Sequence, residues 1–278
     1  MKYMTFNSSC SYAGIANMLE QYGIDTTDRT IALAMKLPYL FAYKNGAYMV
    51  GPMLQSAEWF NLFLHPLGFD MVECEIPAIE LPKYLKQQKT AMLGLQVSNN
   101  DKHAVVYIGT QDSKLVFLNN KWEHDPAPAQ LKLSDAELSD RIKSSAVVAT
   151  LVRIDPRMID LHRYMSQSIP TIQRNLAEIK ALCFSPKTVG ELRSVLNSLF
   201  RPLFLDCITM LKLLGENDLA EKLSNVQQKF LNALRQNSDT AVVLKDHIPI
   251  NVLEEVANGY VTLIAKEMRV CEKINHCR

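Results

Sequence analysis

The chain has 278 residues, of which 48% are hydrophobic and 21% are charged, which is typical of a globular protein long enough for two domains. Its formal net charge is +1, so we expect no nucleic-acid partner and no attraction to a membrane surface. The sequence has no apolar run of the roughly 18 residues that a membrane span needs, and its first residues lack the apolar core of a signal peptide.

Apolar residues recur at helical spacing in the first part of the chain, which predicts helices over 10–22, 29–37 and 52–64. Ser8 or Ser9 is expected to cap the first of these helices with its side-chain oxygen. Pro52 is well placed as the first residue of the third. Between the second and third helices, the segment 38–51 is rich in aromatic residues and is expected to be an irregular loop.

The pattern then changes to short β-branched runs, which predict strands over 71–76, 91–97, 103–109, 114–118 and 147–154. Turns are expected at 98–101 and 110–113. A short helix is expected over 81–88, and Ser134 with Glu137 forms a capping box for another that ends at about Lys143. Helices followed by a mostly antiparallel sheet indicate an α+β domain over residues 1–154.

From residue 155 onward the sequence predicts an all-α antiparallel bundle, with helices over 157–182, 188–214, 219–234 and 251–271. Thr188 with Glu191 forms a capping box for the second helix, and Asn251 is expected to cap the fourth. Pro170 and Pro202 lie near the middle of the first two helices. Two accommodated kinks are favoured over an opened pocket there. The apolar stripes of this domain, 155–278, allow a homodimer but serve an internal core equally well.

Three residues suggest chemistry in the first domain. Cys10 falls in the first turn of a helix, where unpaired backbone N–H groups favour the thiolate, although a lone cysteine in this position is usually a small core residue. His103 opens a strand, and Asn119 ends the strand that returns from it, so an antiparallel hairpin would bring these two side by side. A histidine can take the thiol proton while a third residue orients the ring.

The remaining cysteines and histidines form no comparable pattern. The six cysteines are scattered without metal-site or disulfide spacing, which favours a reducing, cytoplasmic setting. No phosphate-binding loop or zinc motif is present in the sequence, so we expect no cofactor and no metal. The other histidines fall in turns, loops or the helical half: His65, His124, His162, His247 and His276.

Several blocks of the sequence resemble a known superfamily. Residues 9–19 with Tyr22-Gly23-Ile24 resemble a helix that begins at a catalytic cysteine, 102–109 resemble the histidine-headed strand, and 116–120 resemble the segment with the orienting residue. About the first 150 residues are thus similar to papain-like cysteine peptidases and acyltransferases of bacterial type. The resemblance is to double-glycine leader peptidases and to the N-terminal domain of butirosin biosynthesis protein H-like acyltransferases. The latter also resemble this chain in the aromatic segment 40–51 and in having a helical C-terminal region.

The resemblance implies that Cys10 is the nucleophile, His103 the general base and Asn119 the orienting residue. Asn120 is the rival to Asn119, because a register error of one residue would exchange them. The implied reaction passes through a covalent acyl-thioester.

One departure concerns the oxyanion donor. Papain-like peptidases usually carry a glutamine five or six residues before the cysteine, where this chain has Thr5 and Met4. Asn7, together with the backbone N–H of Cys10, is a candidate replacement. The missing glutamine argues against peptide hydrolysis more than against exchange of thioesters or amides, because a thioester is easier to attack.

The sequence therefore favours a cysteine-dependent acyl-transfer enzyme that acts on a small-molecule, acyl-carrier or peptide substrate. The alternative is a catalytically inactive papain-like binding module whose helical domain recognises a partner. A third reading makes the bundle a scaffold and Cys10 a plain core residue. The aromatic segment either forms a substrate-binding wall or packs its rings on the core, with equal weight for its residues Tyr39, Phe41, Tyr43 and Tyr48.

Overall fold

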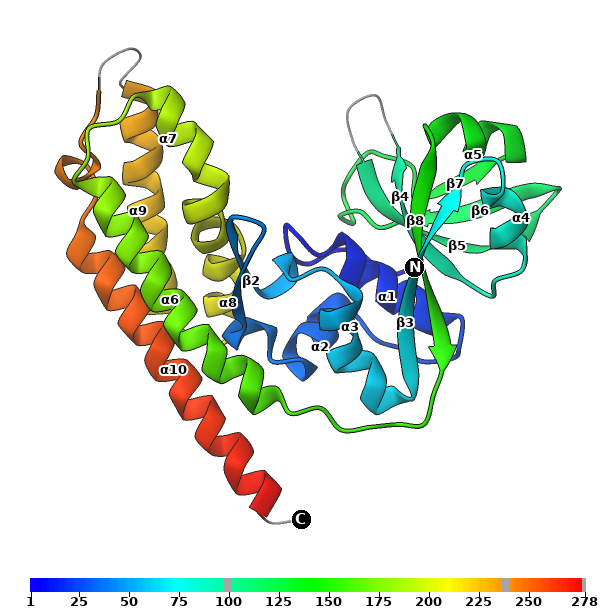
Figure 1. Cartoon of the computed structure of the whole chain (residues 1–278), viewed down its shortest axis with the longest axis horizontal. Helices are drawn as coiled ribbons and strands as arrows, with labels where there is room; N and C mark the ends of the chain where they lie inside the picture. The colour runs from blue at the N-terminus through cyan, green and yellow to red at the C-terminus, as the bar shows by residue number, and fades with distance from the viewer. Residues whose placement is uncertain (98–101, 237–240, 277–278) are drawn as a thin grey trace. The chain divides into compact units, whose positions relative to one another are not determined.

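The computed structural model describes residues 1–97, 102–236 and 241–276, with side chains as far as residue 271. The expected turn at 98–101 lies outside the described residues. The chain divides into two compact units, drawn in Figure 1. We call Met1–Met35 with Gln55–Ile159 the sheet unit, and Lys36–Leu54 with Asp160–Arg278 the helical unit.

The sheet unit is α+β, as the sequence predicted. Its elements are α1 (Cys10–Glu20), α2 (Asp28–Ala34), α3 (Ala57–Leu64), β3 (Phe69–Pro77), α4 (Leu81–Lys86), β4 (Ala91–Gln96), β5 (Lys102–Gln111), β6 (Lys114–Asn119), β7 (Gln130–Leu133), α5 (Asp135–Arg141) and β8 (Ser145–Arg153). The described strands form a six-stranded sheet in the order β3-β8-β4-β5-β6-β7, and every neighbouring pair is antiparallel. The predicted capping box of Ser134 and Glu137 is present at the start of α5.

Helices cover both faces of this sheet. Leu93 of β4 packs in an apolar core with Leu85 of α4 and Leu138 of α5. The adjacent Met92 points to the other face, where it meets α1 at Gly14. A Cβ at position 14 would lie 2.4 Å from the Met92 sulfur, so glycine is what lets α1 approach the strands closely.

The helical unit contains a hairpin and a bundle. Its elements are β1 (Phe41–Lys44), β2 (Ala47–Val50), α6 (Leu161–Cys183), α7 (Val189–Val195), α8 (Ile208–Leu213), α9 (Asn217–Gln236) and α10 (Ile250–His276). Helix α10 packs on α6 and α9, and α6 and α10 run in opposite directions (Figure 1). The predicted capping box of Thr188 and Glu191 is present at the start of α7.

The aromatic segment 38–51 is not the irregular loop that we expected. It forms a short 3-10 turn followed by the β1–β2 hairpin, and it packs within the helical unit. The Phe41 N–H donates to Ser168 Oγ (2.9 Å), and the Tyr260 hydroxyl donates to the Pro38 carbonyl (2.5 Å). These bonds join the hairpin segment to α6 and α10, whereas the sequence grouped it with residues 1–154. The division into domains 1–154 and 155–278 stays a prediction.

Three local predictions are wrong. Pro52 lies in a 3-10 turn, and α3 begins only at Ala57, because the fixed φ of proline suits a 3-10 turn as well as a helix start. Ser9 precedes α1, but its side chain does not cap the helix. Asn251 lies inside α10, which begins one residue earlier.

The two prolines have different effects on their helices. Helix α6 continues through Pro170, whereas Pro202 lies between two π-helical turns, Leu196–Phe200 and Leu203–Cys207. A proline removes one backbone donor and displaces the carbonyl one turn earlier, which widens the local hydrogen-bond pattern. In the described part of the chain no single helix is long and apolar enough to cross a membrane. Two consecutive helical segments, Val189–Phe200 and Leu203–Leu213, together have the length and apolar composition of a membrane span, but they are bent by 54° where they join.

Candidate active site

The sheet unit contains a cavity of about 340 Å³ lined by both Cys10 and His103. We call it the Cys10 cavity. Cys10 reaches it from the start of α1 and His103 from the start of β5. Residues of β3, β4 and β8 line the rest of its wall together with Gln55 and Phe60. Both side chains are partly exposed, so a reactant can approach the sulfur and the ring from the same space.

Asn119 fixes the orientation of the His103 ring. Its Oδ1 lies 3.1 Å from His103 Nδ1, and its Nδ2 donates to the Pro128 carbonyl (3.0 Å). Because that carbonyl can only accept, the amide nitrogen must face it and the amide oxygen must face the ring. The neutral histidine then carries its proton on Nδ1, which leaves Nε2 as the acceptor.

Asn120, the alternative orienting residue, makes a different contact. Its Oδ1 accepts from Asn17 Nδ2 of α1 (3.0 Å), and its backbone N–H donates to the Ala104 carbonyl (3.4 Å). Both asparagines are fully buried, but the strand alternation sends them to opposite faces of the sheet. Asn120 therefore ties α1 to the sheet, while Asn119 contacts His103.

A buried carboxylate organises the segment before Cys10. Asp28 is 1% exposed and accepts from the Ser9 hydroxyl (2.7 Å), the Thr5 N–H (2.5 Å) and the Thr5 hydroxyl (2.8 Å). Ser9 Oγ in turn accepts from the Phe6 N–H (3.1 Å), so its oxygen is engaged by the preceding segment instead of the first N–H groups of α1. In the sequence, the only signal for this contact is a polar residue at the start of α2.

Gln55 is a second site residue that the sequence did not reveal. It lines the Cys10 cavity, its Oε1 accepts from the Ser11 hydroxyl (3.1 Å), and its Nε2 donates to the Ser8 carbonyl. Asn7, the oxyanion donor expected from the sequence, is exposed and does not line this cavity. A side-chain amide thus stands beside the cysteine, but it comes from the segment before α3 rather than from the residues that precede Cys10.

The four aromatic residues of 38–51 belong to the helical unit, and none of them lines the Cys10 cavity. Tyr48 is fully buried, and the Arg174 guanidinium lies 4.1 Å from the centre of the Tyr43 ring. Phe41 is buried against α6, and Tyr39 is partly exposed. Phe41 and Tyr48 thus pack their rings on the core, whereas Tyr43 is 42% exposed. A substrate-binding role for them stays a prediction.

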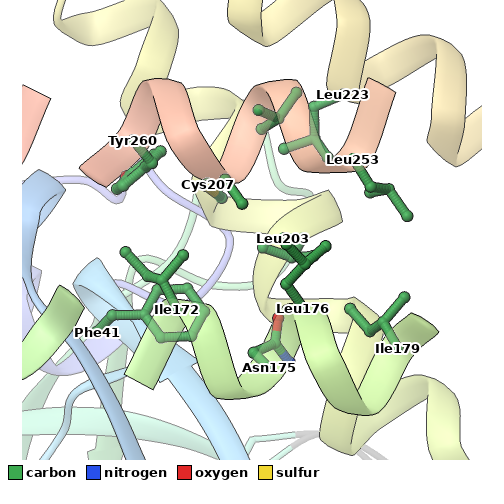
Figure 2. A pocket seen from close by; sticks show the side chains of 12 residues that line it. Phe41, Ile172, Asn175, Leu176, Ile179, Leu203, Cys207, Leu223, Leu253 and Tyr260 are labelled. Atoms are coloured by element: carbon green, nitrogen blue, oxygen red, sulfur yellow. The ribbon is translucent and has the colours of Figure 1, made fainter. Parts of the chain in front are cut away.

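A second cavity lies inside the helical unit and has a different character. Figure 2 shows Tyr260 and Leu253 of α10 facing Ile172 and Asn175 of α6, with Cys207 between the two helices. The cavity of about 20 Å³ is nearly all apolar and admits one water-sized molecule. Two of its lining residues, Ile172 and Leu203, lie just beyond Pro170 and Pro202 in the sequence.

Three other thiols, Cys183, Cys207 and Cys271, provide an internal reference for Cys10. Burial raises the pKa of Cys183 to about 11 and that of Cys207 to about 12, because desolvation disfavours the thiolate. Burial also raises the pKa of Cys271. These three thiols therefore stay protonated near neutral pH, which makes them poor nucleophiles.

Comparisons with known proteins give a limited result. No family model matches this chain, and no curated protein matches its sequence. Among solved structures, the chain is similar to the peptidase domain of Streptococcus ComA, described as a bi-functional ABC transporter involved in a quorum sensing pathway. The identity is 15% and the TM-score 0.37, and the match covers 53% of this chain and 95% of that one.

Proposed function

We propose that the sheet unit is a papain-like cysteine enzyme domain that transfers acyl groups through Cys10. The observation that carries the proposal is the His103–Asn119 hydrogen bond in a cavity that Cys10 also lines, because it leaves Nε2 of the ring free to act as a base in the same space as the thiol. Asn119 is the orienting residue in this proposal. Asn120 is not, because its carboxamide is bonded to Asn17.

The proposed reaction has two balanced steps. His103 takes the thiol proton, the Cys10 sulfur attacks the acyl carbon, and the leaving amine or thiol departs with the proton from the imidazolium. In the second step His103 takes a proton from water or an amine, whose oxygen or nitrogen attacks the acyl-thioester. The Cys10 thiolate then leaves and recovers a proton from His103.

The developing oxyanion needs donors. The backbone N–H of Cys10 is one candidate, since the Ser9 side chain does not cap this helix. Gln55 is a better candidate for the second donor than Asn7, because Gln55 lines the Cys10 cavity. The acyl group comes from a small-molecule, acyl-carrier or peptide substrate. A thioester substrate is favoured because its reaction depends least on hydrogen bonds to the oxyanion.

The test is alkylation of the intact protein with a small excess of iodoacetamide at about pH 6.5, followed by mass spectrometry. At this pH ordinary thiols, with a pKa near 8.5, are mostly protonated and react slowly. We expect one fast adduct that maps to Cys10, slowed about 100-fold in His103→Ala. His162→Ala is the matched control and should leave the rate unchanged. Uniformly slow thiols, unaffected by His103→Ala, would refute the enzyme and leave the sheet unit as a binding module.

A further inference from the structure

A second, larger pocket adjoins the Cys10 cavity on the same sheet. It measures about 640 Å³ and lies between strands β3, β4 and β8 and the chain that follows α5. Gly94, Lys102 and Val147 line both pockets, so the two spaces meet at these residues. A substrate with its acyl carbon at Cys10 can therefore extend into the second pocket without crossing the core.

The second pocket is basic. Its charged lining residues are three cations, Lys102, Arg141 and Lys143, and one carboxylate, Glu75. Glu75 is engaged by the Ser145 hydroxyl within the same pocket. Across the residues with described side chains, neither lysine takes part in an ion pair. Because the whole chain carries a net charge of only +1, this local excess of positive charge is not a general property of the surface.

Lys102 is held at the border between the two pockets. It directly precedes His103 in β5, and a Cβ at Gly94 would lie 2.8 Å from Lys102 Cε. The lysine stem thus lies against the backbone of β4, in space that only a glycine leaves open. The ammonium group stands where a substrate would pass from the base toward the second pocket.

Arg141 contributes to the opposite wall. Its Nη1 donates to the Gln96 carbonyl (3.0 Å), which holds the guanidinium over the end of β4. Lys143 follows in the connection to β8 and is exposed. Cations from β5 and from the α5–β8 connection thus face one space, an arrangement suited to a carboxylate or phosphate oxygen.

We infer that this basic pocket is a subsite for an anionic group, a carboxylate or a phosphate, carried by the substrate whose acyl carbon reacts at Cys10. The inference rests on the proposed function for the reaction at Cys10. It adds the substrate class: an acyl donor or acceptor with a negative charge remote from the reacting carbonyl.

The first experiment compares two thiol reagents of similar size and opposite charge, 2-sulfonatoethyl and 2-(trimethylammonium)ethyl methanethiosulfonate. The measured quantity is the ratio of their rates at Cys10. We expect the sulfonate to react faster, and we expect the ratio to fall at least about fivefold in Lys102→Gln/Lys143→Gln. Arg141 is left unchanged because its bond to Gln96 supports the local fold.

The matched control is Lys83→Gln/Lys132→Gln, which removes the same charge from exposed lysines that line neither pocket. This control should keep the wild-type ratio. A ratio that is equal in all three proteins, with Cys10 still reactive toward iodoacetamide, overturns the subsite and leaves the proposed function standing. An unreactive Cys10 overturns the proposed function instead.

A second measurement does not depend on Cys10. The amide signals of Gly94 and Val147 are followed by NMR during titration with succinate in one arm and pyrophosphate in the other, at constant ionic strength. We expect saturable shifts that are lost in Lys102→Gln/Lys143→Gln and kept in the control. Saturation in one arm alone assigns the anion as carboxylate or phosphate. No saturable shift in either arm overturns the inference.

Discussion

Two cysteines of this chain show how differently one residue type is used in its two units. Cys10 opens onto a cavity of about 340 Å³ with a histidine on its wall, whereas Cys207 borders an apolar gap of about 20 Å³ in the helical unit. Burial raises the pKa of Cys207 to about 12, so its thiol behaves as an apolar side chain. A nearby base and an open cavity, rather than the residue itself, make a cysteine a candidate nucleophile.

The largest expected effect comes from exchanging the two cysteines for alanine in turn. Cys10→Ala should reduce acylation by N-acetylcysteamine thioesters at least about 1,000-fold, because the nucleophile is gone. Cys207→Ala should keep acylation and lower the free energy of unfolding by about 1–2 kcal/mol, because it leaves a void. Intact-mass spectrometry and urea unfolding measure the two quantities. Acylation that persists in Cys10→Ala would show that Cys10 is not the nucleophile, and the contrast with Cys207 would no longer hold.

The next largest effect is expected from removing the charge of Asp28, the buried carboxylate that binds the residues before Cys10. Asp28→Asn should lower the free energy of unfolding by about 2–3 kcal/mol, because an amide cannot accept the same set of hydrogen bonds from Thr5 and Ser9. Cys10 alkylation should slow as well, since this segment positions the first turn of α1. Asp155→Asn, at an exposed site in the same unit, is the control and should match the wild type in urea unfolding and in alkylation.

The adjacent asparagines provide a sharper and smaller test. Asn119→Ala should slow alkylation of Cys10 about tenfold, because the His103 ring loses the acceptor that fixes its tautomer. Asn119→Asp should retain most of the rate, since a carboxylate oxygen can accept from Nδ1. Asn120→Ala should leave alkylation close to wild type and reduce stability through the lost bond to Asn17. The opposite pattern would make Asn120 the orienting residue.

The smallest expected effect is on the pH dependence of the free energy of unfolding in alkaline solution. The Cys207 pKa is raised from 9.0 to about 12 by burial, so the unfolded chain releases this proton at lower pH than the folded chain. Stability therefore falls as the pH rises between these two values, and Cys207→Ala should remove about 1 kcal/mol per pH unit from that fall. Urea unfolding at several alkaline pH values measures the difference. Equal slopes for the two proteins would show that Cys207 is not buried as described.

The parts predicted correctly from sequence are those set by neighbours along the chain. The capping boxes at Ser134 and Thr188 involve residues three apart, and the side-chain contact of His103 with Asn119 follows from one hairpin, in which Asn119 pairs with Val105. The wrong predictions also used local signals, but signals that fit two structures equally well. Pro52 suits a 3-10 turn as well as a helix start.

The parts that could not be predicted depend on contacts between distant segments. The bond of Ser9 to Asp28 and that of Ser11 to Gln55 join positions with no periodic or spacing pattern between them. Strand β7 was missed because it is only four residues long and follows a proline-containing loop. The cytoplasmic location, the substrate and a homodimer through the helical domain stay predictions, because none of them depends on a feature described in the fold.

Gly14 determines how closely α1 can pack on the sheet, and thereby where Cys10 is held for the proposed reaction. Gly14 lies about one turn after Cys10, and an added methyl group there would meet Met92 at 2.4 Å and Asn120 at 2.6 Å. Either these two side chains or the helix would have to move by about 1 Å, and a displacement of that size at a reacting atom can cost about 100-fold in rate. The position of the Cys10 sulfur relative to the His103 ring thus depends on the absence of a side chain at position 14.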